Sequence, residues 1–149
     1  MHPYRIVLAD DHIEFREAIK QVIETSTDIN VVGEVGNSCE LLEFIRKKIS
    51  HMVVMDMSMP NLGGIEATRE IKKAFPEVKV LILSMHKMKE YVYHTLYAGA
   101  DGYLLKDDTG ADLCCAIETI RKGGIYIAPQ NKKMLRLRTG NALAATVQT

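Results

Sequence analysis

Short apolar runs alternate five times with longer segments in which apolar residues recur every three or four positions. The runs cover about residues 4–9, 30–35, 51–56, 78–83 and 102–105. The three clearest periodic sets are Phe15, Ala18, Ile19, Val22 and Ile23; Leu41, Leu42, Ile45 and Ile49; and Leu113, Ala116, Ile117 and Ile120. Runs of this length favour buried strands, and the longer spacing favours helices. The chain therefore predicts five strand–helix units.

Turn-forming residues mark where the predicted helices end. Pro76 stops a helix over about residues 65–75, and Gly123-Gly124 closes the last helix as a C-terminal cap. The fourth helix, about residues 88–98, has the thinnest apolar stripe. We expect this helix to be the least firmly packed, because it has the least apolar surface to bury.

Strands and helices that alternate at these lengths form a parallel sheet with helices on both faces. Right-handed crossovers leave few possible topologies. We predict an α/β fold of the flavodoxin-like, doubly wound kind, with five strands in the order 2-1-3-4-5. This order places the first and third strands side by side at a topological switch point.

Four charged residues lie at the C-terminal ends of three predicted strands. Asp10 and Asp11 follow the first strand, Asp56 ends the third, and Lys106 follows the fifth. Because parallel strands share one C-terminal edge, these side chains are expected to meet there. Ser84, which closes the fourth strand, adds a hydroxyl to the same edge.

Three carboxylates in one pocket need a compensating cation. Two unit charges about 4 Å apart repel by about 4 kcal/mol at an effective dielectric constant near 20. Oxygen ligands of this kind suit Mg²⁺, which would also shield an incoming phosphoryl group. An aspartate carboxylate beside it can act as a nucleophile and form an acyl phosphate. The cluster thus predicts a phosphoryl-transfer site.

Each of these residues also has an ordinary structural explanation. Asp11, with Glu14 three residues later, resembles a capping pair for the first helix. Asp56 alone is typical of a residue that begins a loop, and Lys106 alone is typical of a solvated charge. Ser84 fits a strand-end cap equally well. The functional interpretation rests on all of them converging on one edge.

Charge and cysteine content narrow the class of protein. Residues 1–118 hold all 19 acidic and 13 of the 19 basic residues, so their net charge is −6, whereas residues 119–149 carry +6. Three cysteines, two of them adjacent, argue against a disulfide framework and favour a reducing compartment. No apolar run approaches the length of a membrane span. We expect a cytoplasmic protein without a membrane partner.

The ordered set of motifs resembles the receiver domain of bacterial two-component response regulators. The resemblance covers about residues 4–124, through Leu8-Ala9-Asp10-Asp11-His12, Met55-Asp56-Met57-Ser58-Met59-Pro60, Ser84 and Gly99-Ala100-Asp101-Gly102-Tyr103-Leu104-Leu105-Lys106-Asp107. These segments look most like the NarL/FixJ-type (LuxR-like) subfamily. Members of that subfamily usually carry a C-terminal helix-turn-helix domain that binds DNA.

The resemblance implies a role for each position. Asp56 would be the phosphoacceptor, with Mg²⁺ held by the side chains of Asp11 and Asp56 and by the backbone carbonyl of Ser58. Asp10 would support the metal from the second shell. Lys106 would pair with the phosphoryl oxygens. Ser84 would be the switch hydroxyl, and Tyr103 the aromatic residue whose rotamer follows it. A half-buried strand tyrosine is the alternative for Tyr103.

Three further positions matter: one departs from the pattern of many receivers, and two lie where receivers tune the rate of phosphate loss. Asp107 stands where many receivers have a proline after a cis peptide bond, and a cis bond before a non-proline residue is costly. The geometry of the Lys106–Asp107 bond is therefore open. Ser58 and His86 lie two residues after Asp56 and Ser84, at positions that in receivers tune how fast phosphate is lost. An exposed, uninvolved histidine is the alternative for His86.

We divide the chain into a receiver at residues 1–124 and a linker or basic tail at residues 125–149, with no complete DNA-binding domain. The tail segment 132–138 is basic and mildly amphipathic. It fits contact with DNA phosphates or a membrane surface, but a solvated extension is the preferred interpretation. The chain is either an excised receiver or a natural single-domain protein, and the sequence does not decide between them.

The leading hypothesis is a signalling switch and not an enzyme. A histidine kinase would phosphorylate Asp56 with Mg²⁺, which would change a homodimer or partner interface and, in a full-length protein, regulate transcription. The alternatives are a Mg²⁺-dependent aspartyl phosphohydrolase and a phosphorylation-independent interaction module. A flavodoxin-like cofactor binder is disfavoured, because Asp10-Asp11-His12 has the wrong charge for a phosphate loop.

Overall fold

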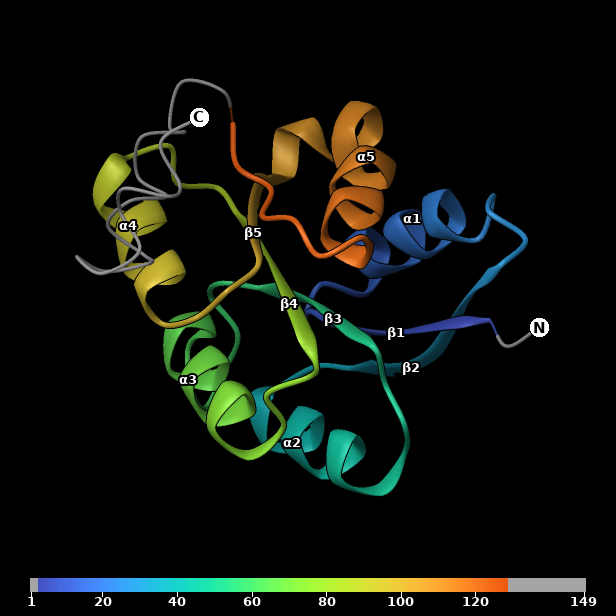
Figure 1. The fold of residues 1–149 in the computed structure, drawn as a ribbon, viewed down its shortest axis with the longest axis horizontal. Helices are drawn as coiled ribbons and strands as arrows, with labels where there is room; N and C mark the ends of the chain where they lie inside the picture. The colour runs from blue at the N-terminus through green and yellow to red at the C-terminus, as the bar shows by residue number, and fades with distance from the viewer. Residues whose placement is uncertain (1–2, 129–149) are drawn as a thin grey trace.

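The computed structural model describes residues 3–128 and contains one parallel sheet between two helical layers (Figure 1). Its strands are β1 (Tyr4–Ala9), β2 (Ile29–Val35), β3 (Met52–Asp56), β4 (Lys79–Ser84) and β5 (Gly102–Leu105). They lie in the order β2-β1-β3-β4-β5, and every pairing is parallel. This confirms the predicted flavodoxin-like topology.

Five α-helices connect and cover the strands. They are α1 (Ile13–Ile23), α2 (Ser38–Lys47), α3 (Gly64–Ala74), α4 (Lys89–Tyr97) and α5 (Thr109–Arg121), and a short 3-10 helix η1 (Lys106–Asp108) precedes α5. Helices α1 and α5 cover one face of the sheet, and α2, α3 and α4 cover the other (Figure 1). Because both faces are covered, the central strands β3 and β4 are apolar throughout most of their length.

The predicted helix ends are close but not all correct. The third helix ends at Ala74, one residue early, because Phe75 precedes Pro76 and leaves the helical conformation. Ile49 was predicted to lie on the second helix, but that helix ends at Lys47. Ile49 is instead 73% exposed on the loop to β3, where its carbonyl accepts a hydrogen bond from Arg5 Nε at 2.7 Å.

Two glycines end helices in the left-handed backbone conformation that favours this residue. Gly99 follows α4 with a φ of 109°, and Gly123 follows α5 with a φ of 96°. The amides of Gly123 and Gly124 bond the carbonyls of Ile120 and Thr119 at the end of α5. The predicted C-terminal cap at Gly123-Gly124 is therefore confirmed.

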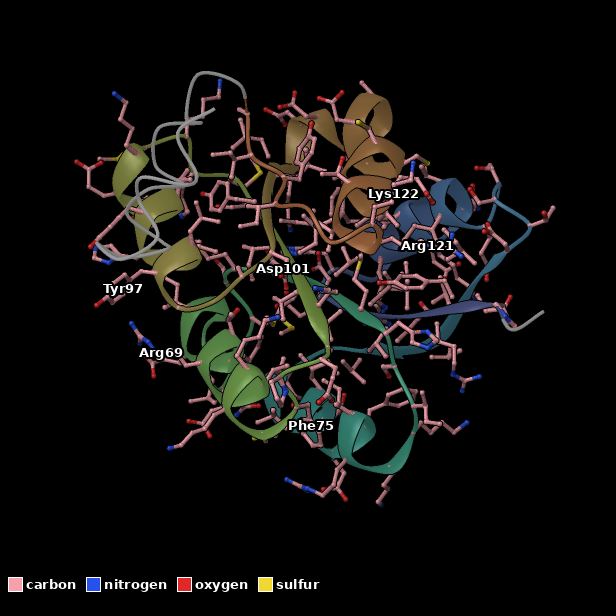
Figure 2. All side chains as sticks on the ribbon, viewed as in Figure 1. Arg69, Phe75, Tyr97, Asp101, Arg121 and Lys122 are labelled. Atoms are coloured by element: carbon pink, nitrogen blue, oxygen red, sulfur yellow. The ribbon has the colours of Figure 1, made fainter. Side chains whose placement is uncertain are left out.

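A partly buried ion pair joins α3 to the loop before β5. Lys72 Nζ lies 2.7 Å from Asp101 Oδ2, which also accepts a hydrogen bond from the Val80 amide at 2.9 Å. Asp101, labelled in Figure 2, is only 5% exposed. This contact fastens the end of the loop and so fixes where β5 begins, next to β4.

The packed body continues past the end of α5. Tyr126 forms an isolated parallel bridge with Gly102, and its carbonyl accepts a hydrogen bond from the Tyr103 amide at 2.9 Å. Ile127 is buried in the core, three residues beyond the predicted domain boundary. The rest of the predicted basic tail, residues 129–149, lies outside the described residues.

Candidate functional site

Asp10 lies at the C-terminal end of β1 and is 2% exposed. Its backbone is held on both sides, because its amide donates to the Val35 carbonyl at 3.0 Å and its carbonyl accepts from Arg16 Nη1 at 2.7 Å. Its Oδ1 accepts the His12 amide at 2.8 Å. Its Oδ2 is buried and receives no hydrogen bond from the described residues, although Lys106 Nζ lies 3.2 Å away.

Asp56 is the last residue of β3 and is 4% exposed. The register of β1 and β3 places their C-terminal ends together, so Asp56 and Asp10 share one pocket, as predicted from the strand order. Burial raises the pKa of Asp56 above its usual range, and the nearby Asp10 carboxylate adds to the increase. The ammonium of Lys106 and the backbone amide of Ser58 act in the opposite direction.

Lys106 begins η1 directly after β5 and reaches across the edge of the sheet. Its Nζ lies 3.2 Å from both Asp10 Oδ2 and Asp56 Oδ1. The same ammonium sits 4.5 Å from the centre of the Phe15 ring on α1, which suits a cation–π contact. Only 11% of its side chain is exposed, so the solvated-charge interpretation of Lys106 is wrong.

The bond after Lys106 is trans, since no peptide bond among residues 3–128 is cis. The chain turns into η1 at this point instead of following the cis-proline route of many receivers. Thr109 Oγ1 closes the turn by donating to the Lys106 carbonyl at 2.9 Å. Asp107 is exposed on this turn.

Asp11 and His12 lie at the open side of the pocket. His12, not Asp11, is the N-cap residue of α1, so the predicted Asp11–Glu14 capping pair is wrong. The side chain of Asp11 is 41% exposed and that of His12 is 69% exposed. His12 Nδ1 lies 3.2 Å from Asp10 Oδ1 and 3.4 Å from Asp11 Oδ1.

The pocket has the donor set of a divalent cation site. One ligand atom from each of Asp10, Asp11, His12 and Asp56 lies within 4.8 Å of all the others. Three carboxylates face a single ammonium, and a buried carboxylate oxygen there lacks a hydrogen bond. A cation would satisfy both deficits, so the residues present fit Mg²⁺.

The switch candidates lie beside this pocket, between β4, β5 and α4. Ser84 Oγ accepts the His86 amide at 2.9 Å and contacts Met57 Sδ at 3.6 Å. Tyr103 is 4% exposed, and its hydroxyl donates to the His86 carbonyl at 2.6 Å. Burial raises the pKa of this phenol. Tyr103 is therefore buried, not the half-buried strand residue of the alternative interpretation.

His86 connects Ser84 and Tyr103 through its backbone. Its ring stacks on Tyr91 of α4, with ring centres 4.1 Å apart. His86 is thus packed and not fully exposed, because its amide, its carbonyl and its ring all have partners. Its effect on phosphate loss stays a prediction. Any movement of the loop after β4 is thus shared by the hydroxyl, the phenol and the helix.

The loop after β3 is shaped by close backbone contacts. The Gly64 amide donates to the Met57 carbonyl at 2.7 Å, and a Cβ at Gly64 would lie 2.8 Å from the Met57 Cα. Ser38 at the start of α2 also binds this loop, through the Leu62 amide at 2.7 Å. These contacts hold Met57 and Ser58 next to Asp56.

Sequence reasoning missed several residues that shape the site. Phe15 was assigned only to a helical stripe, and His12 and Arg16 were given no role. Their position in the sequence could have indicated a role at the site, since all three follow Asp10-Asp11 within one or two helical turns. The orientation of their side chains depends on where α1 begins, which the sequence pattern does not define.

Residues 6–118 match the family described as the response regulator receiver domain. The chain belongs to this family. The transcriptional regulatory protein DegU of Brevibacillus brevis is 38% identical over 126 residues, which cover 85% of this chain and 53% of DegU. The oxygen regulatory protein NreC of Staphylococcus carnosus is 35% identical over 127 residues, which cover 85% of this chain and 58% of NreC.

A solved receiver-family structure agrees with the fold. A LuxR-family two-component response regulator from Aurantimonas sp. SI85-9A1 has a TM-score of 0.83 and 34% identity, covering 93% of this chain and 99% of that one. The chain is thus a NarL/FixJ-type receiver domain of a two-component system, and its relatives are transcriptional regulators.

This receiver chain spans about half the length of the curated relatives that it matches. Within residues 3–128, no helix is both long enough and apolar enough to cross a membrane. Cys39, Cys114 and Cys115 are all free and exposed on helices, which agrees with the predicted absence of a disulfide framework in this part of the chain.

Proposed function

We propose that this receiver is a cytoplasmic phosphorylation switch in which Asp56 accepts a phosphoryl group from a histidine kinase. One observation carries the proposal: Asp56 shares a buried pocket with Asp10, and Lys106 Nζ lies 3.2 Å from both carboxylates. The pocket therefore combines three features of a phosphoryl-transfer site. Asp56 is a buried nucleophile, the carboxylates supply negative charge for a cation, and Lys106 can pair with phosphoryl oxygens.

The chemistry follows from the position of Asp56. A carboxylate oxygen attacks the phosphorus of a phosphohistidine, the P–N bond breaks, and the electron pair leaves with the imidazole. Bound Mg²⁺ would neutralise charge on the carboxylates and the phosphoryl oxygens. We assign it to the side chains of Asp11 and Asp56 and the backbone carbonyl of Ser58, with Asp10 in the second shell.

Phosphorylation would then act on the loop after β4. The new group brings a charge of about −1.5 to −2 and three acceptor oxygens. Lys106 is already beside it, and Ser84 is the nearby hydroxyl donor. To turn toward the phosphate, Ser84 Oγ has to give up the His86 amide, which it now accepts at 2.9 Å. The freed loop would carry the His86 carbonyl, and with it the Tyr103 hydroxyl bonded at 2.6 Å.

Helix α4 is the element that this movement would displace. Its first turn contacts the loop through the His86–Tyr91 stack. Its thin apolar stripe leaves Tyr97 63% exposed, and Met85 and Met88 on the preceding loop are also exposed. Few buried contacts hold such a helix, so a modest gain at the pocket would be enough to shift it.

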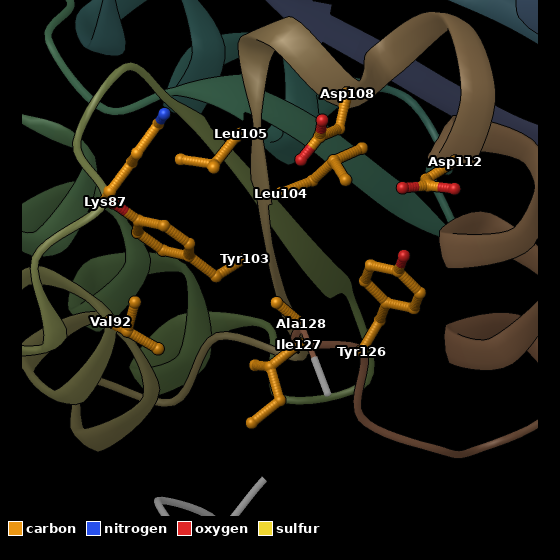
Figure 3. Close-up of a pocket in the computed structure, with 10 residues that line it drawn as sticks. All are labelled: Lys87, Val92, Tyr103, Leu104, Leu105, Asp108, Asp112, Tyr126, Ile127 and Ala128. Atoms are coloured by element: carbon orange, nitrogen blue, oxygen red, sulfur yellow. The ribbon is translucent and has the colours of Figure 1, made fainter. Parts of the chain in front are cut away.

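The same movement would be felt where the chain leaves the receiver. Tyr103 and the exit residues Tyr126 and Ile127 line one cavity of 260 Å³ (Figure 3). The Tyr103 amide is also bonded to the Tyr126 carbonyl. We infer that phosphorylation changes a homodimer or partner interface and, through a C-terminal DNA-binding domain outside this chain, transcription. One structural match contains RcsB dimers bound to DNA.

The lifetime of the phosphate would depend on two side chains at the mouth of the site. Ser58 is exposed beside Asp56, and His86 borders the groove that Ser58 also lines. A hydroxyl and an imidazole bordering this groove would orient or exclude an attacking water. We propose that Ser58 and His86 set the rate of phosphate loss, and that this slow self-hydrolysis is the limit of the chain's catalysis.

The test is acetyl phosphate labelling of the full chain, with and without Mg²⁺, read by intact mass. We expect one added phosphoryl group that requires Mg²⁺, maps to Asp56 and is absent from Asp56→Ala. Asp107→Ala removes an exposed carboxylate on the same edge and should label normally. Undiminished labelling of Asp56→Ala would place the acceptor elsewhere and remove the basis of the proposal.

A second variant tests the switch separately from the chemistry. Lys106→Ala should leave Mg²⁺ binding largely intact but uncouple phosphorylation from any change in oligomeric state, measured by light scattering. Normal coupling in this variant would show that Lys106 does not carry the signal.

A further inference from the structure

His12 brings an imidazole nitrogen to the open side of the acidic pocket, although receivers of this kind are expected to hold their cation through oxygen atoms. His12 Nδ1 lies 3.2 Å from Asp10 Oδ1 and 3.4 Å from Asp11 Oδ1. Two ligand atoms bound at right angles to one cation, each at about 2.1 Å, are about 3 Å apart. Both distances from His12 Nδ1 are therefore close to the spacing of two ligands that share one cation.

The backbone of His12 is fixed in this position. Its amide donates to Asp10 Oδ1 at 2.8 Å, and its carbonyl accepts the Arg16 amide at 3.0 Å in the first turn of α1. The backbone that carries the ring is therefore fixed by the start of a helix, and the ring itself contacts Asp10 Oδ1 through Nδ1 at 3.2 Å. A ligand anchored in this way loses less conformational freedom when it binds a cation.

A second observation points independently to a cation. Asp10 Oδ2 is buried without a hydrogen bond from the described residues, and the ammonium near it is shared with Asp56. The pocket thus holds three carboxylates against one lysine. A buried carboxylate oxygen without a hydrogen bond is costly unless a positive charge compensates it.

We propose that His12 is a metal ligand that gives this site a preference for a first-row transition cation of the Zn²⁺, Ni²⁺ and Co²⁺ class. The proposal rests on the function proposed above, because it concerns the same acidic pocket. Imidazole suits these borderline cations, whereas Mg²⁺ favours oxygen atoms and retains its waters. Both kinds of cation compete for the Asp11 carboxylate, and His12 adds affinity for only one of them.

The exposure of the ring agrees with such a role. The His12 side chain is 69% exposed and that of Asp11 is 41% exposed, so a hydrated cation reaches both without opening the fold. The buried Asp10 and Asp56 lie behind them. A transition cation held by Asp11 and His12 would occupy the approach to Asp56, and its concentration would then modulate phosphorylation.

The experiment compares Co²⁺ and Mg²⁺ affinities of the full chain by titration calorimetry, with Co²⁺ absorption as a second readout. We expect His12→Ala to lower Co²⁺ affinity at least about tenfold and to change Mg²⁺ affinity by less than about twofold. His12→Gln should behave in the same way and guards against a folding defect. His94→Ala removes an exposed imidazole on α4 and should change neither affinity.

Loss of both affinities to the same extent in His12→Ala and His12→Gln, or loss of neither, would overturn the proposal. Mg²⁺-dependent labelling of Asp56 in the same samples separates this result from the proposed function. If labelling persists while the Co²⁺ affinities of wild type and His12→Gln agree, only the role of His12 fails. If wild type does not label at all, the phosphoacceptor role fails, while the Co²⁺ comparison still decides the role of His12.

Discussion

The two ends of the sheet use charge in opposite ways. At the N-terminal end lies Arg121, labelled in Figure 2. Its Nη1 is 2.7 Å from Asp28 Oδ2, and its guanidinium lies over the Tyr4 ring, 4.7 Å from the ring centre. At the C-terminal end, Asp10 and Asp56 share one ammonium, and the pKa of Asp56 is raised by burial. The charges of the first arrangement are paired within the protein. The second has excess negative charge, which a bound cation would compensate.

The difference separates structural from functional electrostatics. At the N-terminal end, the Tyr4 ring also stacks on the His51 ring, with ring centres 5.0 Å apart, and burial raises the pKa of Tyr4 to about 12. His51 Nδ1 accepts the Arg5 amide at 2.9 Å. Arg121, Asp28 and His51 thus all have partners within the protein itself. The charge in the pocket at Asp56 is unfavourable for folding, and its role is to bind a cation and a phosphoryl group.

The largest effect should come from removing the shared ammonium. Lys106→Met keeps an apolar stem beside Phe15 but leaves two buried carboxylates uncompensated. We expect a loss of about 3 kcal/mol in the free energy of unfolding at pH 7. The loss should shrink as the pH falls and the carboxyls become protonated. Urea titrations at pH 7 and pH 5 measure this loss. Equal losses at both pH values would contradict the role of Lys106 in compensating the two carboxylates.

At the N-terminal end, Arg121→Ala tests the satisfied arrangement. The variant loses the contacts with Asp28 and Tyr4, and we expect a loss of about 1–2 kcal/mol, because the guanidinium is only partly buried. Unlike the Lys106 effect, this loss should change little between pH 5 and pH 7. Arg46→Ala, on an exposed pair with Glu43, is the matched control and should cost less than about 0.5 kcal/mol.

Asp56→Asn should stabilise the protein. A carboxyl whose pKa is raised by folding binds its proton more tightly in the folded state, so its ionisation favours unfolding as the pH rises through that range. Removing the charge should therefore add about 1 kcal/mol at pH 7, and the gain should disappear below the ordinary pKa of an aspartate. Thermal melts across pH 3.5–7 check it. A loss of stability at pH 7 would mean that Lys106 outweighs burial.

The smallest effect concerns His51. Burial is the main cause that lowers the pKa of this imidazole, and the positive charges of Arg5 and Arg121 add to the decrease. The Arg5 amide also donates to Nδ1, which accepts it only while that nitrogen carries no proton. Protonation is thus easier in the unfolded chain, and stability should fall as the pH drops below the ordinary histidine pKa. Between pH 7.5 and pH 5.5, we expect the free energy of unfolding to fall by a few tenths of a kcal/mol less in His51→Asn than in the wild type. Denaturant midpoints at the two pH values measure the difference.

The sequence predicted the strand order and most of the pocket for a simple physical reason. A strand buried on both faces has to be apolar, so the point where Asp10 or Asp56 interrupts the run marks the sheet edge. The same pattern is silent about side chains in loops. Because α1 begins at Ile13, its N-cap is His12, and this places the imidazole beside the pocket. The spacing of Asp11 and Glu14 had wrongly predicted Asp11 as the cap.

Helix α4 shows the other limit of prediction. Its position was predicted to within one residue at each end, even though its apolar stripe is thin. The bond between the Tyr103 hydroxyl and the His86 carbonyl was not predictable, since a side chain on one strand meets the backbone of a loop that follows another. Contacts of this kind depend on the tertiary arrangement and have no local pattern.

The bridge between Gly102 and Tyr126 has a consequence for solubility. β5 is the last strand in the sheet order, and an open edge of this kind offers unpaired amides and carbonyls to any other extended chain. The Tyr126 amide donates to the Asp101 carbonyl, and the Tyr126 carbonyl accepts the Tyr103 amide. The segment after α5 thus pairs with the beginning of the β5 edge and leaves fewer backbone groups there open to edge-to-edge aggregation.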